Sequence, residues 1–112
     1  MKKISATILD FAKPVLDELP PGIPLETRRE ALGFAILVWN ALVMVERGRP
    51  DFLAELRERL DTLAGVDLVT NAFDRLVERK HQRYAADDRL VGNWELKLKP
   101  GGAMSLWAEA RR

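Results

Sequence analysis

Apolar positions run almost without a break through the middle of this chain. From Ala31 to Val45 only Asn40 carries a polar side chain, and charged residues at 28–30 and 46–47 bound the stretch. As a helix it would span roughly 22 Å, less than the roughly 30 Å hydrocarbon core of a bilayer. A helix that is apolar on every side has to be buried on every side. We therefore expect the span from Leu32 to Val45 to be almost wholly inaccessible to solvent in the functional assembly.

Helical periodicity continues on both sides of this stretch and predicts four helices, at about 4–19, 27–47, 50–64 and 67–86. Thr27 and Glu30 have the spacing of a capping box, and Gly48 is suited to the left-handed conformation that ends a helix. Pro14 predicts either a kink near Asp10 or a split of the first helix into two. The third and fourth helices draw their apolar stripes from Phe52, Leu53, Leu56, Leu60 and Leu63, and from Leu68, Ala72, Phe73, Leu76 and Val77.

Beyond Asp87 and Asp88 the pattern alternates with the period of a strand, which predicts a hairpin at about 91–110. A Pro-Gly-Gly loop at 100–102 would pair Leu96 with Leu106, whereas a Gly-Gly loop would pair Leu96 with Trp107. We prefer the first register because it gathers six apolar side chains on one face and leaves Trp107 on the other, opposite Glu95. These six are Trp94, Leu96, Leu98, Met104, Leu106 and Ala108.

The predicted fold is therefore α+β: four helices, the second apolar and central, followed by a C-terminal β-hairpin, all in one domain of 112 residues. The chain has no cysteine, which excludes disulfides and thiolate metal sites. Asp10 interrupts the apolar run near the N-terminus, so we expect a cytoplasmic protein with no membrane segment. The 18 basic and 17 acidic side chains nearly cancel, which removes a general electrostatic argument for nucleic acid.

Three residues are candidates for an interface. Asn40 is either a buried amide bonded to a loop backbone or a polar group that fixes the register of a helix pair. Gly33 lies in the same sector of the helix, where a missing side chain would let another backbone approach. Trp107 is either an exposed association residue or covered by the aliphatic stems of Lys97 or Arg111.

Basic side chains concentrate on the fourth helix. Arg75, Arg79 and Arg83 repeat every four residues and, together with Arg89, form a ridge of a kind that can contact phosphates. Neighbouring carboxylates nearly neutralise this ridge, so a solvated face is the simpler interpretation.

Metal and catalytic patterns are weak. Glu78 and His81 have the Glu-x-x-His spacing of di-iron bundles, but Glu78 falls opposite the apolar stripe of its helix, and such ligands project inward. Asp87 and Asp88 could bind a cation, although turn chemistry explains them equally well. We therefore assign no catalytic residue, no metal ligand and no cofactor.

The function predicted from the sequence is a small, non-catalytic interaction module that associates with itself, as a twofold dimer. A nucleic-acid-associated regulator that uses the arginine ridge is the alternative, and an enzyme or metal protein comes third.

Overall fold

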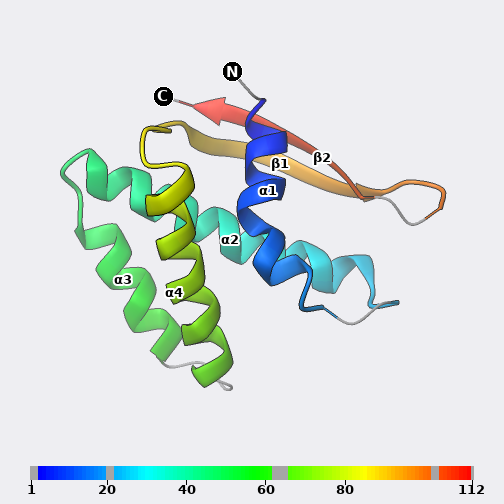
Figure 1. Cartoon of the computed structure of the whole chain (residues 1–112), viewed down its shortest axis with the longest axis horizontal. Helices are drawn as coiled ribbons and strands as arrows, with labels where there is room; N and C mark the ends of the chain where they lie inside the picture. Colours follow the sequence, from blue (N-terminus) through cyan, green and yellow to red (C-terminus); the bar gives the residue numbers. More distant parts are fainter. Residues whose placement is uncertain (1–2, 20–21, 62–65, 102–103, 112) are drawn as a thin grey trace.

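The computed structural model describes residues 3–19, 22–61, 66–101 and 104–111. Its elements, in chain order, are α1 (Ile4–Leu16), α2 (Leu25–Glu46), α3 (Asp51–Asp61), α4 (Val66–Arg83), β1 (Leu90–Leu98) and β2 (Met104–Arg111). The two strands pair antiparallel. Four helices followed by a C-terminal hairpin confirm the predicted α+β fold (Figure 1).

α2 is the central element, because it contacts α1, α3, α4 and β1. In Figure 1, α1 crosses in front of α2, and α3 and α4 run side by side at one end. α1 also packs against α4 and β2, so it joins the helices to the hairpin. The buried apolar side chains form one cluster: Ile4, Ile8, Phe11, Ala12, Leu32, Ala35, Ile36, Val38, Trp39, Leu42, Val43, Phe73, Leu76, Val91 and Leu96.

The helix boundaries differ from the expected ones by at most two residues at the N-terminal ends, whereas α1 and α4 end three residues early. α2 begins at Leu25 after Pro24, whose backbone is extended and gives no side-chain cap. Thr27 therefore lies inside the first turn, and the predicted capping box is wrong. α1 is continuous through Pro14, which excludes a split into two helices, and it ends at Leu16, before the expected 19. The predictions for Leu60, Leu63 and Leu68 fall outside the described side chains.

The end of α2 is as predicted. Gly48 takes a φ of 86°, which a residue without Cβ adopts at little cost. Its N–H bonds to the carbonyl of Val45 at 3.0 Å, and the N–H of Arg49 bonds to the carbonyl of Met44 at 2.8 Å. This pair of bonds is a Schellman motif, and it turns the chain from α2 into α3.

The hairpin has the preferred register. Leu96 lies opposite Leu106, Glu95 opposite Trp107 and Leu98 opposite Met104. The pairing is irregular between Val91 and Trp94, where β1 carries a bulge-like shift. Gly102 of the predicted loop lies outside the described residues, so the structure tests the register and not the whole loop.

The chain alone does not bury α2 on every side. Trp39 and Leu32 are completely buried, but Leu37 is 57% exposed in the middle of the helix, and Met44 and Val45 are half-buried. Complete burial is therefore wrong for the single chain. It stays a prediction for an assembly.

Candidate functional site

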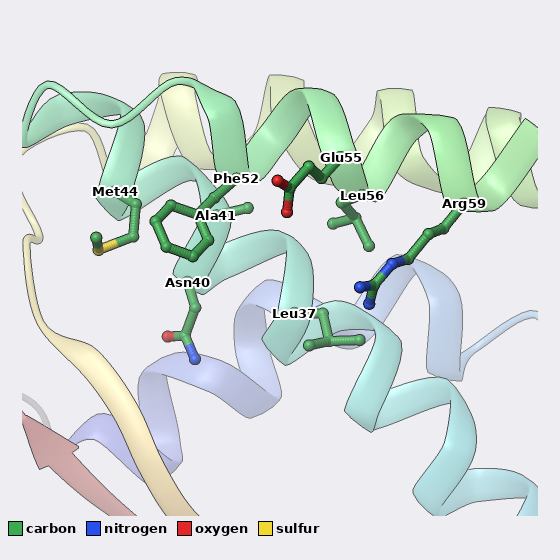
Figure 2. Close-up of a pocket in the computed structure, with 8 residues that line it drawn as sticks. All are labelled: Leu37, Asn40, Ala41, Met44, Phe52, Glu55, Leu56 and Arg59. Atoms are coloured by element: carbon green, nitrogen blue, oxygen red, sulfur yellow. The ribbon is translucent and has the colours of Figure 1, made fainter.

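A groove between α2 and α3 is lined largely by apolar side chains (Figure 2). We call it the α2 groove. It encloses about 350 Å³ and is lined by Leu37, Asn40, Ala41 and Met44 of α2 and by Phe52, Glu55, Leu56 and Arg59 of α3. Leu37, Ala41 and Met44 share a face because they are four and three residues apart. Leu37 and Phe52 are 57% and 40% exposed, so large apolar side chains meet water here.

The α2 groove continues towards the hairpin. A second hollow of about 660 Å³ shares Leu37, Asn40, Leu56 and Arg59 with it and extends to Trp94. Together the two hollows follow the outer side of α2 along most of its apolar stretch. The site is therefore an open channel over a helix face.

Asn40 bridges α2 and the first strand. Its Nδ2 donates to the carbonyl of Val91 at 3.0 Å, and its Oδ1 accepts from the N–H of Val91 at 2.8 Å. The amide thus occupies the place of a neighbouring strand at the irregular start of β1. The first interpretation was a buried amide bonded to a loop backbone; the amide does bond to backbone, but to a strand residue, and its half-buried side chain also lines the groove.

Gly33 accommodates a side chain of the same chain. A Cβ built at this position would lie 3.4 Å from Cζ2 of Trp94 and 3.7 Å from its Cη2. The indole of Trp94 therefore packs over the glycine. Trp94 thus occupies the space beside Gly33 in which the sequence suggested that a second helix could approach.

Trp107 lies on the outer face of the hairpin, as predicted, and is 59% exposed. Leu98, close to the hairpin turn, is 44% exposed although it belongs to the inner face. Its exposure follows from the shape of the molecule, because the hairpin turn projects past the helices in Figure 1.

The arginine ridge faces one carboxylate of α1, Asp10, and one in the turn that follows α1, Glu18. Arg75 pairs with Glu18, and Arg83 lies 3.9 Å from Oδ2 of Asp10. Arg79 lies 3.4 Å from Oδ1 of Asp10 and is largely buried. Two carboxylates therefore face the three arginines that the alternative function assigned to phosphate contact.

A backbone carbonyl explains why Arg79 turns towards α1. Pro14 has no N–H, so it cannot donate to the carbonyl of Asp10, four residues earlier in the helix. Nε and Nη2 of Arg79 donate to that carbonyl instead, at 3.1 and 2.9 Å. The proline thus creates an acceptor that ties α1 to α4.

Arg89 is buried, apart from the other three arginines. Its Nε and Nη2 donate to the carboxylate of Asp87 at 2.9 and 2.5 Å, and Nη2 reaches the hydroxyl of Thr7 at 3.3 Å. The hydrogen bonds from Arg89 lower the pKa of Asp87 below its ordinary value. Arg89 therefore helps to attach the start of the hairpin to α1, and Asp87 is used within the chain.

Lys80 is completely buried, which the sequence analysis did not anticipate. Its Nζ donates to the carbonyls of Tyr84 and Asp87 at 2.9 and 2.8 Å, lies 3.7 Å from Glu46, and sits 4.6 Å from the ring centre of Trp39. Burial lowers the pKa of Lys80, and the nearby carboxylates partly offset this effect.

A sequence signal for Lys80 did exist. It follows Phe73 by seven residues and Leu76 by four, so it lies on the apolar stripe of α4. The cation binds two carbonyls just beyond the C-terminal end of its own helix, where positive charge is favourable.

The weak metal pattern does not gather ligands. Glu78 and His81 are exposed, and Glu78 accepts a hydrogen bond from Gln82 at 3.0 Å. Within the described part of the chain, no group of three or more His, Cys, Asp or Glu side chains could hold a metal ion. The same part contains no helix with the length and hydropathy needed to cross a membrane.

Comparisons with protein-family models, with curated proteins and with solved structures find no match to this chain.

Proposed function

We propose that this chain is a small, non-catalytic interaction module that associates with itself. The α2 groove is the observation that carries the proposal. It exposes Leu37 on the wall formed by α2 and Phe52 on the wall formed by α3, and the sequence of α2 is apolar on all sides. Contiguous exposed apolar surface with a polar rim is typical of protein–protein contact.

The buried polar groups support a structural role for the rest of the molecule. Lys80, Arg89 and Asn40 each bond to backbone or side-chain groups of another segment, and they hold the hairpin against the helices. These bonds fix the hairpin and the helices relative to one another, and the open groove is a surface of the resulting framework.

Sedimentation equilibrium from nanomolar to tens of micromolar tests the proposal. We expect the mass to rise with concentration towards twice the 12.7 kDa of the single chain. A mass that stays at 12.7 kDa over the whole range would contradict self-association.

A further inference from the structure

The part of the hairpin that projects past the helices exposes large apolar side chains on both of its faces (Figure 1). Leu98 is 44% exposed on the inner face, where it pairs with Met104, and Trp107 is 59% exposed on the outer face. Leu96 lies two residues nearer the helices and is buried, so the inner face leaves the core only at this end. The exposed apolar groups therefore lie on both sides of the hairpin and do not form a single face.

Two lysines place positive charge among these apolar side chains. Lys97 and Lys99 are exposed, and no ion pair joins either of them to a carboxylate in the part of the chain that the structure describes. Residues 96–108 contain no Asp or Glu, although the chain has 17 acidic residues. The flanking acids are Glu95 and Glu109, and the carboxylate of Glu109 is already paired within β2 at 3.0 Å. The near-neutral charge of the whole chain therefore conceals a local excess of positive charge.

The length of the exposed segment fits the depth of a lipid headgroup layer. Three residues separate Met104 from Trp107, which is about 10 Å along a strand. Apolar side chains of segments that lie in a membrane interface are buried about 5–10 Å into the boundary between headgroups and acyl chains. Leu98 and Trp107 can therefore reach this layer together, while the long stems of the two lysines keep their ammonium groups beside the lipid phosphates.

Exposure on two faces decides which kind of partner fits. A nucleic acid strand that stacks on a sheet, or a folded protein that packs on it, covers one face. A lipid headgroup layer is fluid and closes around a segment that enters it, so it contacts both faces at once. Tryptophan is enriched at this depth of a membrane, and anionic lipids attract lysine side chains near the surface. The combination of apolar and basic groups therefore fits an anionic lipid surface best.

We propose that the end of the hairpin, formed by Lys97, Leu98, Lys99 and Trp107, docks on the surface of a bilayer that contains anionic lipids. Such attachment lies in the interface and does not require a helix that spans the membrane. The docking site is on the hairpin and not in the α2 groove, so this inference does not depend on the proposed self-association.

Sedimentation with lipid vesicles tests the proposal. One set of vesicles contains phosphatidylcholine alone, and the other contains phosphatidylcholine and phosphatidylglycerol in equal parts. We expect the wild-type chain to partition at least about tenfold more strongly to the anionic vesicles, because each lysine near such a surface contributes about fivefold. Lys97→Glu combined with Lys99→Glu should remove this preference.

Two further double variants separate the hairpin from the net charge of the chain. Lys13→Glu combined with Arg29→Glu changes the net charge by the same amount at exposed positions on the helices, and it should keep the wild-type preference. Leu98→Ser combined with Trp107→Ser keeps the charge and should weaken binding about tenfold, because less apolar surface leaves water. All three variants change exposed side chains and should keep the circular dichroism spectrum of the folded chain.

Four results would overturn the proposal. Equal partitioning of the wild type to both kinds of vesicle would exclude anionic lipid as the partner. An equal loss in the variant of the helices would show a response to net charge alone. Unchanged binding after the two serine substitutions would show that the hairpin does not enter the headgroup layer. Binding of the wild type to single-stranded oligothymidylate, without binding to vesicles, would assign the two lysines to nucleic acid.

Discussion

Trp39 connects α2 to most of the segments around it. Its Nε1 donates to the carbonyl of Arg89 at 2.7 Å, and its ring meets Phe11 edge to face with centroids 5.1 Å apart. The buried ammonium of Lys80 also lies over the Trp39 ring, 4.6 Å from its centre. A single side chain thus contributes packing, a hydrogen bond and a neighbour for a buried charge.

Replacing Trp39 with alanine should therefore lower the free energy of unfolding by about 3–5 kcal/mol. The reason is the cavity left in the core, together with a carbonyl of Arg89 that loses its donor. Urea unfolding followed by circular dichroism measures the loss. Trp107→Ala is the matched control and should change stability by no more than about 0.5 kcal/mol, because its side chain is exposed. Similar losses for the two variants would contradict the central position of Trp39.

Because Arg89 lowers the pKa of Asp87, we expect the free energy of unfolding to fall in acid. Hydrogen bonds from Arg89 hold its pKa below 3.8, so the folded chain binds this proton more weakly than the unfolded chain does. The stability that Asp87 contributes is complete above about pH 3.8 and is lost as the pH falls through the lowered pKa. Asp87→Asn should cost about 3–5 kcal/mol at pH 7 and should flatten the decline in acid.

Thermal melts from pH 7 to pH 2 check this prediction. The exposed Asp74→Asn is the control and should follow the wild-type curve. An Asp87→Asn variant with the same acid decline as the wild type would show that the pair with Arg89 does not contribute.

At the scale of the elements, Pro14 and Arg79 link α1 to α4. The carbonyl of Asp10 accepts from Arg79 because the proline cannot donate to it. Arg79→Met should therefore destabilise the wild type by about 1–3 kcal/mol. In a Pro14→Ala background the loss should be smaller, because the new N–H can bond to that carbonyl.

A double-mutant cycle on these two positions measures the coupling, which we expect to be about 0.5–2 kcal/mol. Arg83→Met is the control, since Arg83 is 54% exposed and its ion pair is with the carboxylate of Asp10 and not with the carbonyl. Its effect should add to that of Pro14→Ala. If the effects of Arg79→Met and Pro14→Ala were also additive, the hydrogen bonds from Arg79 to the Asp10 carbonyl would make no contribution to stability.

The hydrophobic pattern was sufficient to predict the elements. Period 3.6 located the four helices, and period 2 determined the hairpin register, because a slip by one residue would have turned Leu96 away from the core. The partners of polar groups were not predictable in this way. Periodicity marks which face of a helix is buried but not which segment covers it, so the pairing of the α4 arginines with α1 was missed.

The candidate site was only partly visible in the sequence. Asn40 was singled out correctly as a polar group in an apolar helix, but its bond to Val91 depends on the position of β1. The absence of a side chain at Gly33 makes room for Trp94, which lies 61 residues away along the chain. The exposure of Leu37 could not be inferred, because the sequence of α2 is equally apolar on its covered and uncovered sides.

At the scale of the whole molecule, a flat chain leaves one side of its central helix uncovered. The polar bonds of Arg79, Lys80 and Arg89 join the elements on the covered side, while the uncovered side keeps Leu37 and Phe52 in water. The proposed self-association predicts that a second copy covers this side.

Thiol accessibility tests that claim most directly, because the chain has no cysteine of its own. Leu37→Cys and Trp107→Cys, made separately, each introduce a single thiol whose rate of modification can be followed against protein concentration. We predict that the thiol at position 37 reacts more slowly as the dimerised fraction increases, while the thiol at position 107 reacts at one rate throughout. A rate at position 37 that does not depend on concentration, in a chain shown to dimerise, would contradict the account.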